Sequence, residues 1–145
     1  MTDTPPPSDA LLAPLASRIA AVSTRWKQAL AAELGPARVP GLQPGNLLDS
    51  GIEAIYEGYA LHRNASRVLK STSSDHLQLL IGDWCYAAGL CDVAASGDLD
   101  AVSTLADLIA DTAIMAEEQP RPDGTPDPRD ICWDEALASL VPGRD

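Results

Sequence analysis

Three basic side chains recur at helical spacing near the middle of the chain and have the right charge to hold a phosphate. Arg63, Arg67 and Lys70 stand at positions i, i+4 and i+7, which places all three along one side of a helix. Guanidinium and ammonium groups bind phosphate oxygens through charge-assisted hydrogen bonds, so this set suits a diphosphate. A structural role is the alternative, because cations near the end of a helix complement its dipole and pair with neighbouring acids.

Paired acids suggest a second chemistry, the binding of Mg²⁺. Asp107 and Asp111 lie one helical turn apart, but they share a polar stripe with Asp100, and this favours exposure to water. Glu53 and Glu57 are also one turn apart, and a solvated pair is a simpler interpretation than a general acid and base. We therefore predict no metal site and no catalytic residue among these acids.

Asp83 is the least expected acid in the sequence. It lies between Ile81 and Trp84 in the most apolar segment, where a lone carboxylate is costly to bury. A buried ion pair with one of the three basic residues explains it, and a third ligand for a magnesium ion is the less favoured reading. Asp83 therefore joins those residues as a candidate ligand-binding residue.

Histidine and cysteine offer little further chemistry. His62 and His76 lack the spacing of a metal-binding pair, and each suits a cap or a surface position. Cys85, Cys91 and Cys132 form neither a CxxC motif nor an even set, so we expect reduced thiols, no zinc and no disulfide framework. No cofactor is implied.

The composition excludes several classes of protein. The chain has 145 residues and a formal charge of −11, which argues against a nucleic-acid partner. Residues 76–145 hold fourteen acids and three bases, so the acidic excess lies in the second half. No apolar run is long enough for a membrane-spanning segment and no secretory signal is visible, so we expect a cytoplasmic protein.

The placement of proline predicts helices. All 12 prolines lie within residues 5–44 or 120–142, and the block between them is rich in Ala and Leu and has no strand-like alternation. We therefore predict an all-α fold, a compact bundle of about five helices. Caps and breakers place these helices at Pro14 to about Leu34, Asn46 or Asp49 to about Lys70, the segment 71–75 to Ser96, Leu99 to about Glu118, and 128–141.

These elements form one expected domain over residues 10–145, after a disordered tail at 1–9. Its core is expected at 46–119, followed by a Pro-rich loop at 120–130 and the short last helix. The third helix is apolar nearly all round, so we expect it at the centre of the bundle or at an interface. The residues expected in that core or interface are Leu80, Trp84, Tyr86 and Leu90.

Several short motifs within residues 67–119, about a third of the chain, are similar to motifs of one known family. They are Arg67 with Lys70, Ser71 and Thr72, the helix LLIGDWCYA, the Ser96-Gly97-Asp98 turn, and Glu118-Gln119. Their order resembles the middle of trans-isoprenyl diphosphate synthases. That family has an Asp-Asp-x-x-Asp metal motif about thirty residues before its Gly-Asp, whereas this chain has GIEAIYEGYA there, and a second aspartate-rich motif is also missing.

The resemblance therefore implies a helical chain without the metal-binding acids that drive prenyl transfer. We predict a noncatalytic adaptor or accessory subunit that assembles into a homo-oligomer or binds a larger protein partner, as small subunits of heteromeric prenyl synthases do. The alternative is a small helical protein that binds a prenyl, lipid or diphosphate ligand in an apolar pocket.

Overall fold

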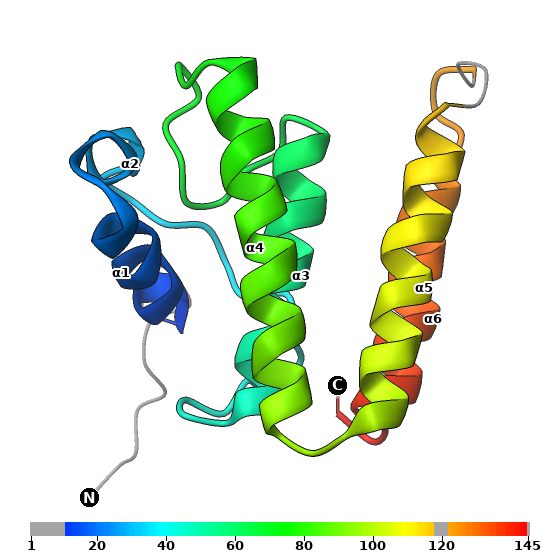
Figure 1. Cartoon of the computed structure of the whole chain (residues 1–145). Helices are drawn as coiled ribbons and strands as arrows, with labels where there is room; N and C mark the ends of the chain where they lie inside the picture. The colour runs from blue at the N-terminus through cyan, green and yellow to red at the C-terminus, as the bar shows by residue number, and fades with distance from the viewer. Residues whose placement is uncertain (1–10, 118–121, 145) are drawn as a thin grey trace, which may run out of the picture.

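The computed structural model describes residues 11–117 and 122–144 and confirms an all-α bundle. In the described part there are no strands, and one isolated antiparallel bridge joins Leu30 and Leu69. Figure 1 shows a central pair, α3 and α4, with α1 and α2 on one side and the α5–α6 hairpin on the other. The helices are α1 (Ala13–Val22), α2 (Thr24–Ala29), α3 (Leu47–His62), α4 (Asp75–Ala95), α5 (Leu99–Ala116) and α6 (Pro128–Leu140).

Two glycine pairs let α3 and α4 pack closely. Gly51 faces Gly89, and Gly58 faces Gly82, so the same seven-residue spacing recurs on both antiparallel helices. A methyl group at Gly89 would lie 2.6 Å from the Gly51 carbonyl oxygen, and one at Gly58 would lie 2.9 Å from the Gly82 carbonyl oxygen. The backbones therefore meet where no side chain fits, which fixes the register of the two helices.

The third predicted helix, α4, belongs to the central pair (Figure 1), and α3 is the more deeply buried of the two. Eleven of the 16 residues of α3 are buried, against seven of the 21 residues of α4. Leu80 is 47% exposed and so lies outside the core. Trp84 packs against one core cluster, and Tyr86 and Leu90 pack against the other, each of them partly buried.

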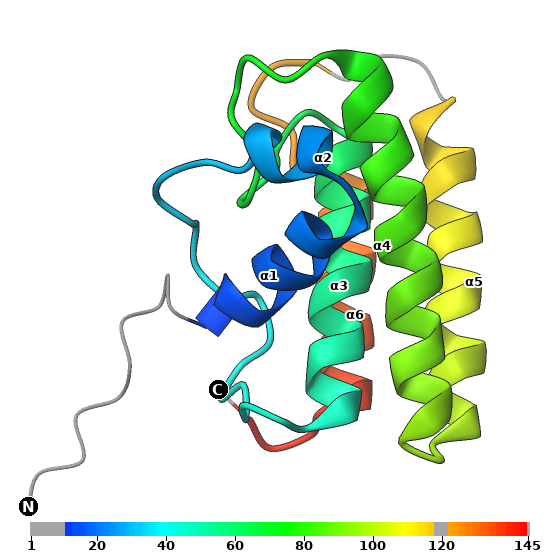
Figure 2. The same ribbon diagram turned by 60° about the vertical axis from the view of Figure 1, so that its left-hand side comes forward.

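The first predicted helix is broken into two. Ser23 has an extended backbone, and its hydroxyl oxygen accepts a hydrogen bond from the Trp26 N–H at 3.1 Å, so it caps a new helix. Figure 2 shows α1 crossing in front of α3. The first helix and its N-cap contribute three buried residues, Leu12, Leu15 and Ile19, to the core cluster that also includes residues of α3 and α4.

The second predicted helix ends eight residues early, at His62 instead of Lys70. Asn64 adopts the left-handed backbone conformation, with φ of 58°. The Ala65 N–H then donates to the Ala60 carbonyl at 2.8 Å, and the Asn64 N–H donates to the Leu61 carbonyl at 3.5 Å. This is the hydrogen-bond pattern of a Schellman motif, which ends a helix and turns the chain away.

The segment after this turn pairs with the extended link that follows α2. The Lys70 N–H donates to the Ala29 carbonyl at 2.9 Å, and the Gly35 N–H donates to the Arg67 carbonyl at 2.7 Å. A methyl group at Gly35 would lie 2.8 Å from Arg67 Cβ. Residues 67–70 are therefore held as an extended segment beside residues 29–35.

The remaining helix caps agree with the sequence. Asn46, Ser74, Asp98 and Asp127 cap α3, α4, α5 and α6, and the second core cluster joins α5 and α6 to the central pair. The predicted tail at 1–9 and the predicted helix end at Glu118 lie outside the described residues. None of the described helices is long and apolar enough to cross a membrane.

Candidate functional site

A buried ion cluster lies at the centre of the molecule, where α3 meets the segment 66–69. The Arg67 Nε donates to Glu57 Oε1 at 2.9 Å, and its Nη1 contacts the Glu53 carboxylate. The side chains of Arg67, Glu53 and Glu57 are 11%, 4% and 0% exposed. The guanidinium carbon lies 4.8 Å from the centre of the Tyr56 ring. The two acids share a face because they are four residues apart on one helix.

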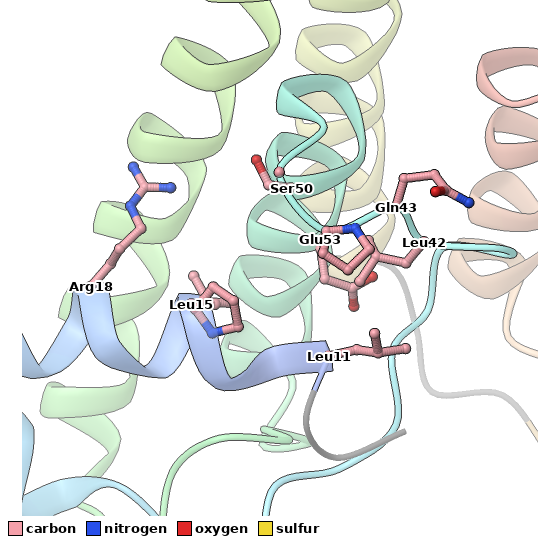
Figure 3. Close-up of a pocket in the computed structure, with 10 residues that line it drawn as sticks. Leu11, Leu15, Arg18, Leu42, Gln43, Ser50 and Glu53 are labelled. Carbon is pink, nitrogen blue, oxygen red and sulfur yellow. The ribbon is translucent and has the colours of Figure 1, made fainter. Parts of the chain in front are cut away.

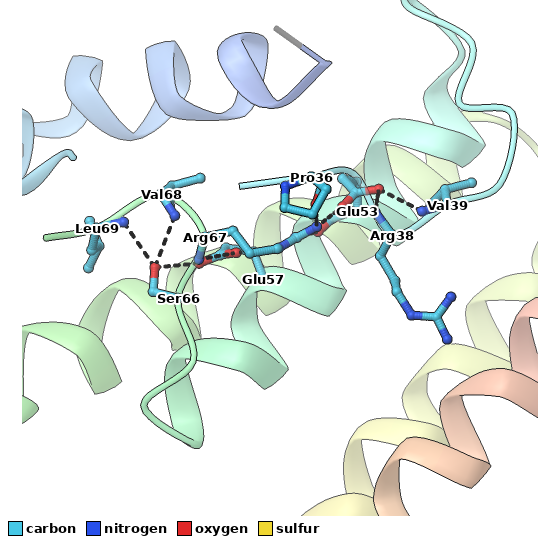
Figure 4. Close-up of polar contacts among 9 residues, drawn as sticks. All are labelled: Pro36, Arg38, Val39, Glu53, Glu57, Ser66, Arg67, Val68 and Leu69. Carbon is cyan, nitrogen blue, oxygen red and sulfur yellow. Dashed lines mark hydrogen bonds and ion pairs between the residues drawn. The ribbon is translucent and has the colours of Figure 1, made fainter. Parts of the chain in front are cut away.

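The same two carboxylates anchor the loops that flank α3. Glu53 accepts the backbone N–H groups of Arg38 and Val39, at 2.9 and 3.0 Å. Glu57 accepts the Ser66 hydroxyl at 2.7 Å, and the Ser66 oxygen in turn accepts the Leu69 N–H at 2.9 Å (Figure 4). Buried acids are thus paired with donors of the chain itself, which is the arrangement that makes their burial tolerable.

Burial and charge act in opposite directions in this cluster. Burial raises the pKa of Glu57 above its ordinary value, although the Arg67 charge and several hydrogen bonds act to lower it. For Arg67, burial acts to lower the pKa, but the charges of Glu53 and Glu57 outweigh it and raise the pKa. One cation, Arg67, therefore pairs with two buried acids, and burial disfavours the ionised form of Glu57.

Asp49 is a third buried acid on the same face of α3, four residues before Glu53, and the sequence analysis missed its role. Asp49 is fully buried, and its Oδ2 accepts the Gln43 N–H at 2.9 Å and the Arg144 guanidinium at 2.7 Å. Its Oδ1 has no hydrogen-bond partner among the described residues. The spacing of residues 49, 53 and 57 could have indicated this role, because it places three acids on one helix face. Such acids must either be exposed to water or be paired with donors from other segments.

The three basic residues do not lie along one side of a helix. Arg63 contacts the Asp130 carboxylate, donates to the Tyr59 hydroxyl at 2.8 Å, and so joins α3 to α6. Arg67 belongs to the buried cluster. Lys70 is exposed and has no ion-pair partner among the described residues. The early end of α3 is the physical reason for this separation.

Asp83 is not the buried acid that the sequence suggested. Its side chain is 72% exposed, and its Oδ1 lies 3.0 Å from His62 Nε2 instead of contacting an arginine or lysine. The His62 Nδ1 lies 2.6 Å from the Gly58 carbonyl oxygen, and the ring stacks on Tyr86 with 4.9 Å between centroids. His62 therefore ties the end of α3 to α4.

Two further predicted features are placed by the structure. Asp107 and Asp111 are exposed on α5, and the described residues include no group of three metal-binding side chains. Cys85 is fully buried, and burial raises the pKa of its thiol, so this sulfur is unsuited to act as a nucleophile.

Several pockets open on the described surface, among them three with different lining residues. One of about 70 Å³ lies between α1, the loop 42–45 and α3 (Figure 3). A second, of about 350 Å³, lies beside the first turn of α4, and a third, of about 220 Å³, shares Asn64 and Asp75 with it. Neither family models, nor curated proteins, nor solved structures gave a match to this chain.

Proposed function

We propose that this chain is a noncatalytic helical subunit that assembles with itself or with a larger protein partner. The observation that carries the proposal is the exposure of large aliphatic side chains on the two longest helices. Leu79 and Leu80 of α4 are 46% and 47% exposed, and Leu99 and Ile114 of α5 are 71% and 66% exposed. Burial of such side chains against another protein is favourable, by about 25 cal/mol per Å² of apolar surface.

The acids of α3 support the noncatalytic part of the proposal. Glu53 and Glu57 occupy the position where the resembled synthases have their first aspartate-rich motif. Here both carboxylates accept hydrogen bonds from Arg67 and from the loops around α3. In this proposal the two carboxylates stabilise the fold and take no part in catalysis. A cytoplasmic location is part of the proposal, and the three free cysteines support it.

Assembly can be tested with paired serine variants. The purified chain is examined by sedimentation velocity, and a tagged chain is isolated gently from its host and weighed by native mass spectrometry. We expect a homo-oligomer or a stoichiometric complex that is weakened about tenfold or more by Leu79→Ser with Leu80→Ser, or by Leu99→Ser with Ile114→Ser.

The matched control is Val22→Ser with Ile131→Ser, which changes exposed aliphatic residues of α1 and α6. This control should assemble like the unmodified chain. A monomer without a bound protein would contradict the proposal, and so would equal assembly of all the variants.

Ligand binding remains the second candidate, on the strength of the pocket beside α1. Leu11, Leu15 and Leu42 give it an apolar wall, and Arg18 lies at its edge (Figure 3). Its volume of about 70 Å³ is small, since a cavity of roughly 150 Å³ is what holds benzene. Titration with geranyl diphosphate tests this candidate: saturable binding at these residues would favour it over assembly.

A further inference from the structure

The polar pocket beside α4 includes several side chains that make no hydrogen bond to the described part of the chain. It has a volume of about 350 Å³, within the range of small-molecule sites. Its lining comes from the end of the α3 turn, the loop 66–73 and the first turn of α4. The lining residues are Asn64, Ser66, Leu69, Lys70, Ser71, Ser73, Asp75 and Gln78.

Gln78 is the most informative of these residues. It is only 7% exposed, and its amide nitrogen donates to the Ser73 carbonyl at 2.9 Å. Its amide oxygen has no hydrogen-bond partner among the described residues. This oxygen is not among the enclosed polar atoms that lack a partner, so it is open to the pocket that Gln78 lines, where a ligand can donate a hydrogen bond to it.

The other polar side chains of the pocket add both donors and acceptors. The Asn64 amide, the Lys70 ammonium and the Ser71 hydroxyl have no partner in the described part of the chain. Asp75 contributes a carboxylate to the same lining. Asn64 is held in place by the left-handed turn that ends α3, so its position is set by the fold.

The balance of charge separates the ligand classes. Lys70 and Asp75 supply one positive and one negative charge, so the lining has no excess of cations for a diphosphate. A hydroxyl group both donates and accepts, and it therefore satisfies an ammonium, a carboxylate and an amide oxygen equally well. The adjoining pocket of about 220 Å³ adds Leu61, His62 and Leu79, against which C–H groups can pack.

We propose that this pocket binds a small, uncharged polyhydroxyl compound of about monosaccharide size. Its hydroxyl groups would be held by Asn64, Lys70, Asp75 and Gln78, and its less polar face would lie toward Leu61 and Leu79. This site is separate from the buried ion cluster and from the aliphatic side chains of α5, but it shares Leu79 with the proposed assembly surface. The variants that test it, at Asn64 and Lys70, lie outside that surface, so its failure can be distinguished from failure of the proposed function.

Titration of the isotope-labelled full chain with D-glucose and myo-inositol, followed by amide NMR, tests the site. We expect saturable shifts confined to residues 61–79, with a Kd of about 1–10 mM for at least one of the two compounds. Glycerol, with only three hydroxyl groups, should bind about tenfold more weakly. Sodium pyrophosphate should not compete.

Two variants and one control localise the effect. Asn64→Gly removes the amide but keeps a residue suited to φ of 58°, and Lys70→Met removes the ammonium of an exposed side chain. Each should weaken binding about fivefold. Lys27→Met on α2, also exposed, should leave it unchanged.

Three results would overturn the proposal. One is a linear response without saturation for glucose, inositol and glycerol alike. Another is tighter binding of pyrophosphate at the same residues, which would make the pocket an anion site. The third is unchanged affinity in both Asn64→Gly and Lys70→Met, with circular dichroism showing that each variant is folded.

Discussion

The acids of α3 and those of α5 have similar helical spacing but opposite environments. Asp49, Glu53 and Glu57 follow one face of α3 and are all buried. Asp100, Asp107 and Asp111 of α5 are all exposed and have no hydrogen-bond or ion-pair partner in the described part of the chain. A regular row of acids along one helix face is therefore buried on α3 and exposed to solvent on α5.

Whether such acids are buried depends on hydrogen-bond donors from segments outside the helix. The three acids of α3 meet two arginines, Arg67 and Arg144, together with backbone N–H groups of the loop 38–43. The described part of α5 and the turn before it, residues 96–117, contain no lysine or arginine. A stripe of acids is thus a core feature only where other segments of the chain bring donors to it.

The largest effect is expected when the central donor is removed. Arg67→Met leaves two buried carboxylates without their cation, and we expect a loss of about 3–5 kcal/mol in the free energy of unfolding. Urea denaturation followed by circular dichroism measures it. Lys70→Met, an exposed control three residues away, should change stability by less than about 0.5 kcal/mol. Equal effects of the two variants would mean that the α3 cluster is no more important than a surface charge.

The close approach of α3 and α4, the central pair (Figure 1), is expected to give the second largest effect. In Gly89→Ala the new methyl group would lie 2.6 Å from both the Gly51 carbonyl oxygen and Ile55 Cγ1. We expect a loss of about 1–3 kcal/mol as the helices separate. The control is Gly97→Asn at the turn before α5, where nothing lies within 4 Å and Asn tolerates the positive φ. Similar stability of Gly89→Ala and the unmodified chain would show that the helices can move apart freely.

Local signals in the sequence were sufficient for most helix ends. Asn46, one of two predicted cap residues, caps α3, and Ser74, within the predicted segment 71–75, caps α4. Asp98 and Asp127, directly before the predicted starts of the last two helices, cap α5 and α6, because a cap depends on residues within one turn. The early end of α3 was missed, although Asn64 is itself a known signal for a left-handed helix end. The stripe of apolar residues that continues to Leu69 belongs to an extended segment.

The candidate site was harder to predict, because its contacts join distant segments. Glu53 and Glu57 look like a solvated pair until Arg67 folds back over them, and Asp49 meets Arg144 from the far end of the described chain. Asp83 looks buried because its neighbours are apolar, yet it lies on the outer side of α4. Periodicity gives the face of a helix, but the partner of that face depends on tertiary contacts.

The pH dependence of stability should distinguish the two sets of acids. The pKa of Glu57 is raised in the folded chain above its ordinary value of 4.5, so the folded state binds this proton more tightly than the unfolded state does. The contribution of Glu57 to stability is therefore present below pH 4.5 and is lost as pH rises through the folded pKa.

Denaturation of the unmodified chain and of Glu57→Gln over about pH 4–8 measures this contribution. The stability of the unmodified chain relative to the variant should fall as pH rises. The exposed variant Asp107→Asn should show no such trend. A relative gain in stability with rising pH would mean that the attraction of Arg67 outweighs the cost of burial at Glu57.

The smallest effect is expected on α5. Asp107→Asn with Asp111→Asn removes two exposed charges that no described donor contacts, so the free energy of unfolding should change by less than about 0.5 kcal/mol. Because the chain carries a net charge of −11, the sign should be a slight gain in stability at low salt that disappears as salt screens the repulsion. Denaturation at low and high ionic strength measures the change in the free energy of unfolding and its dependence on salt. A clear loss of stability would show that these aspartates have partners after all, and the contrast between α3 and α5 would then be one of degree.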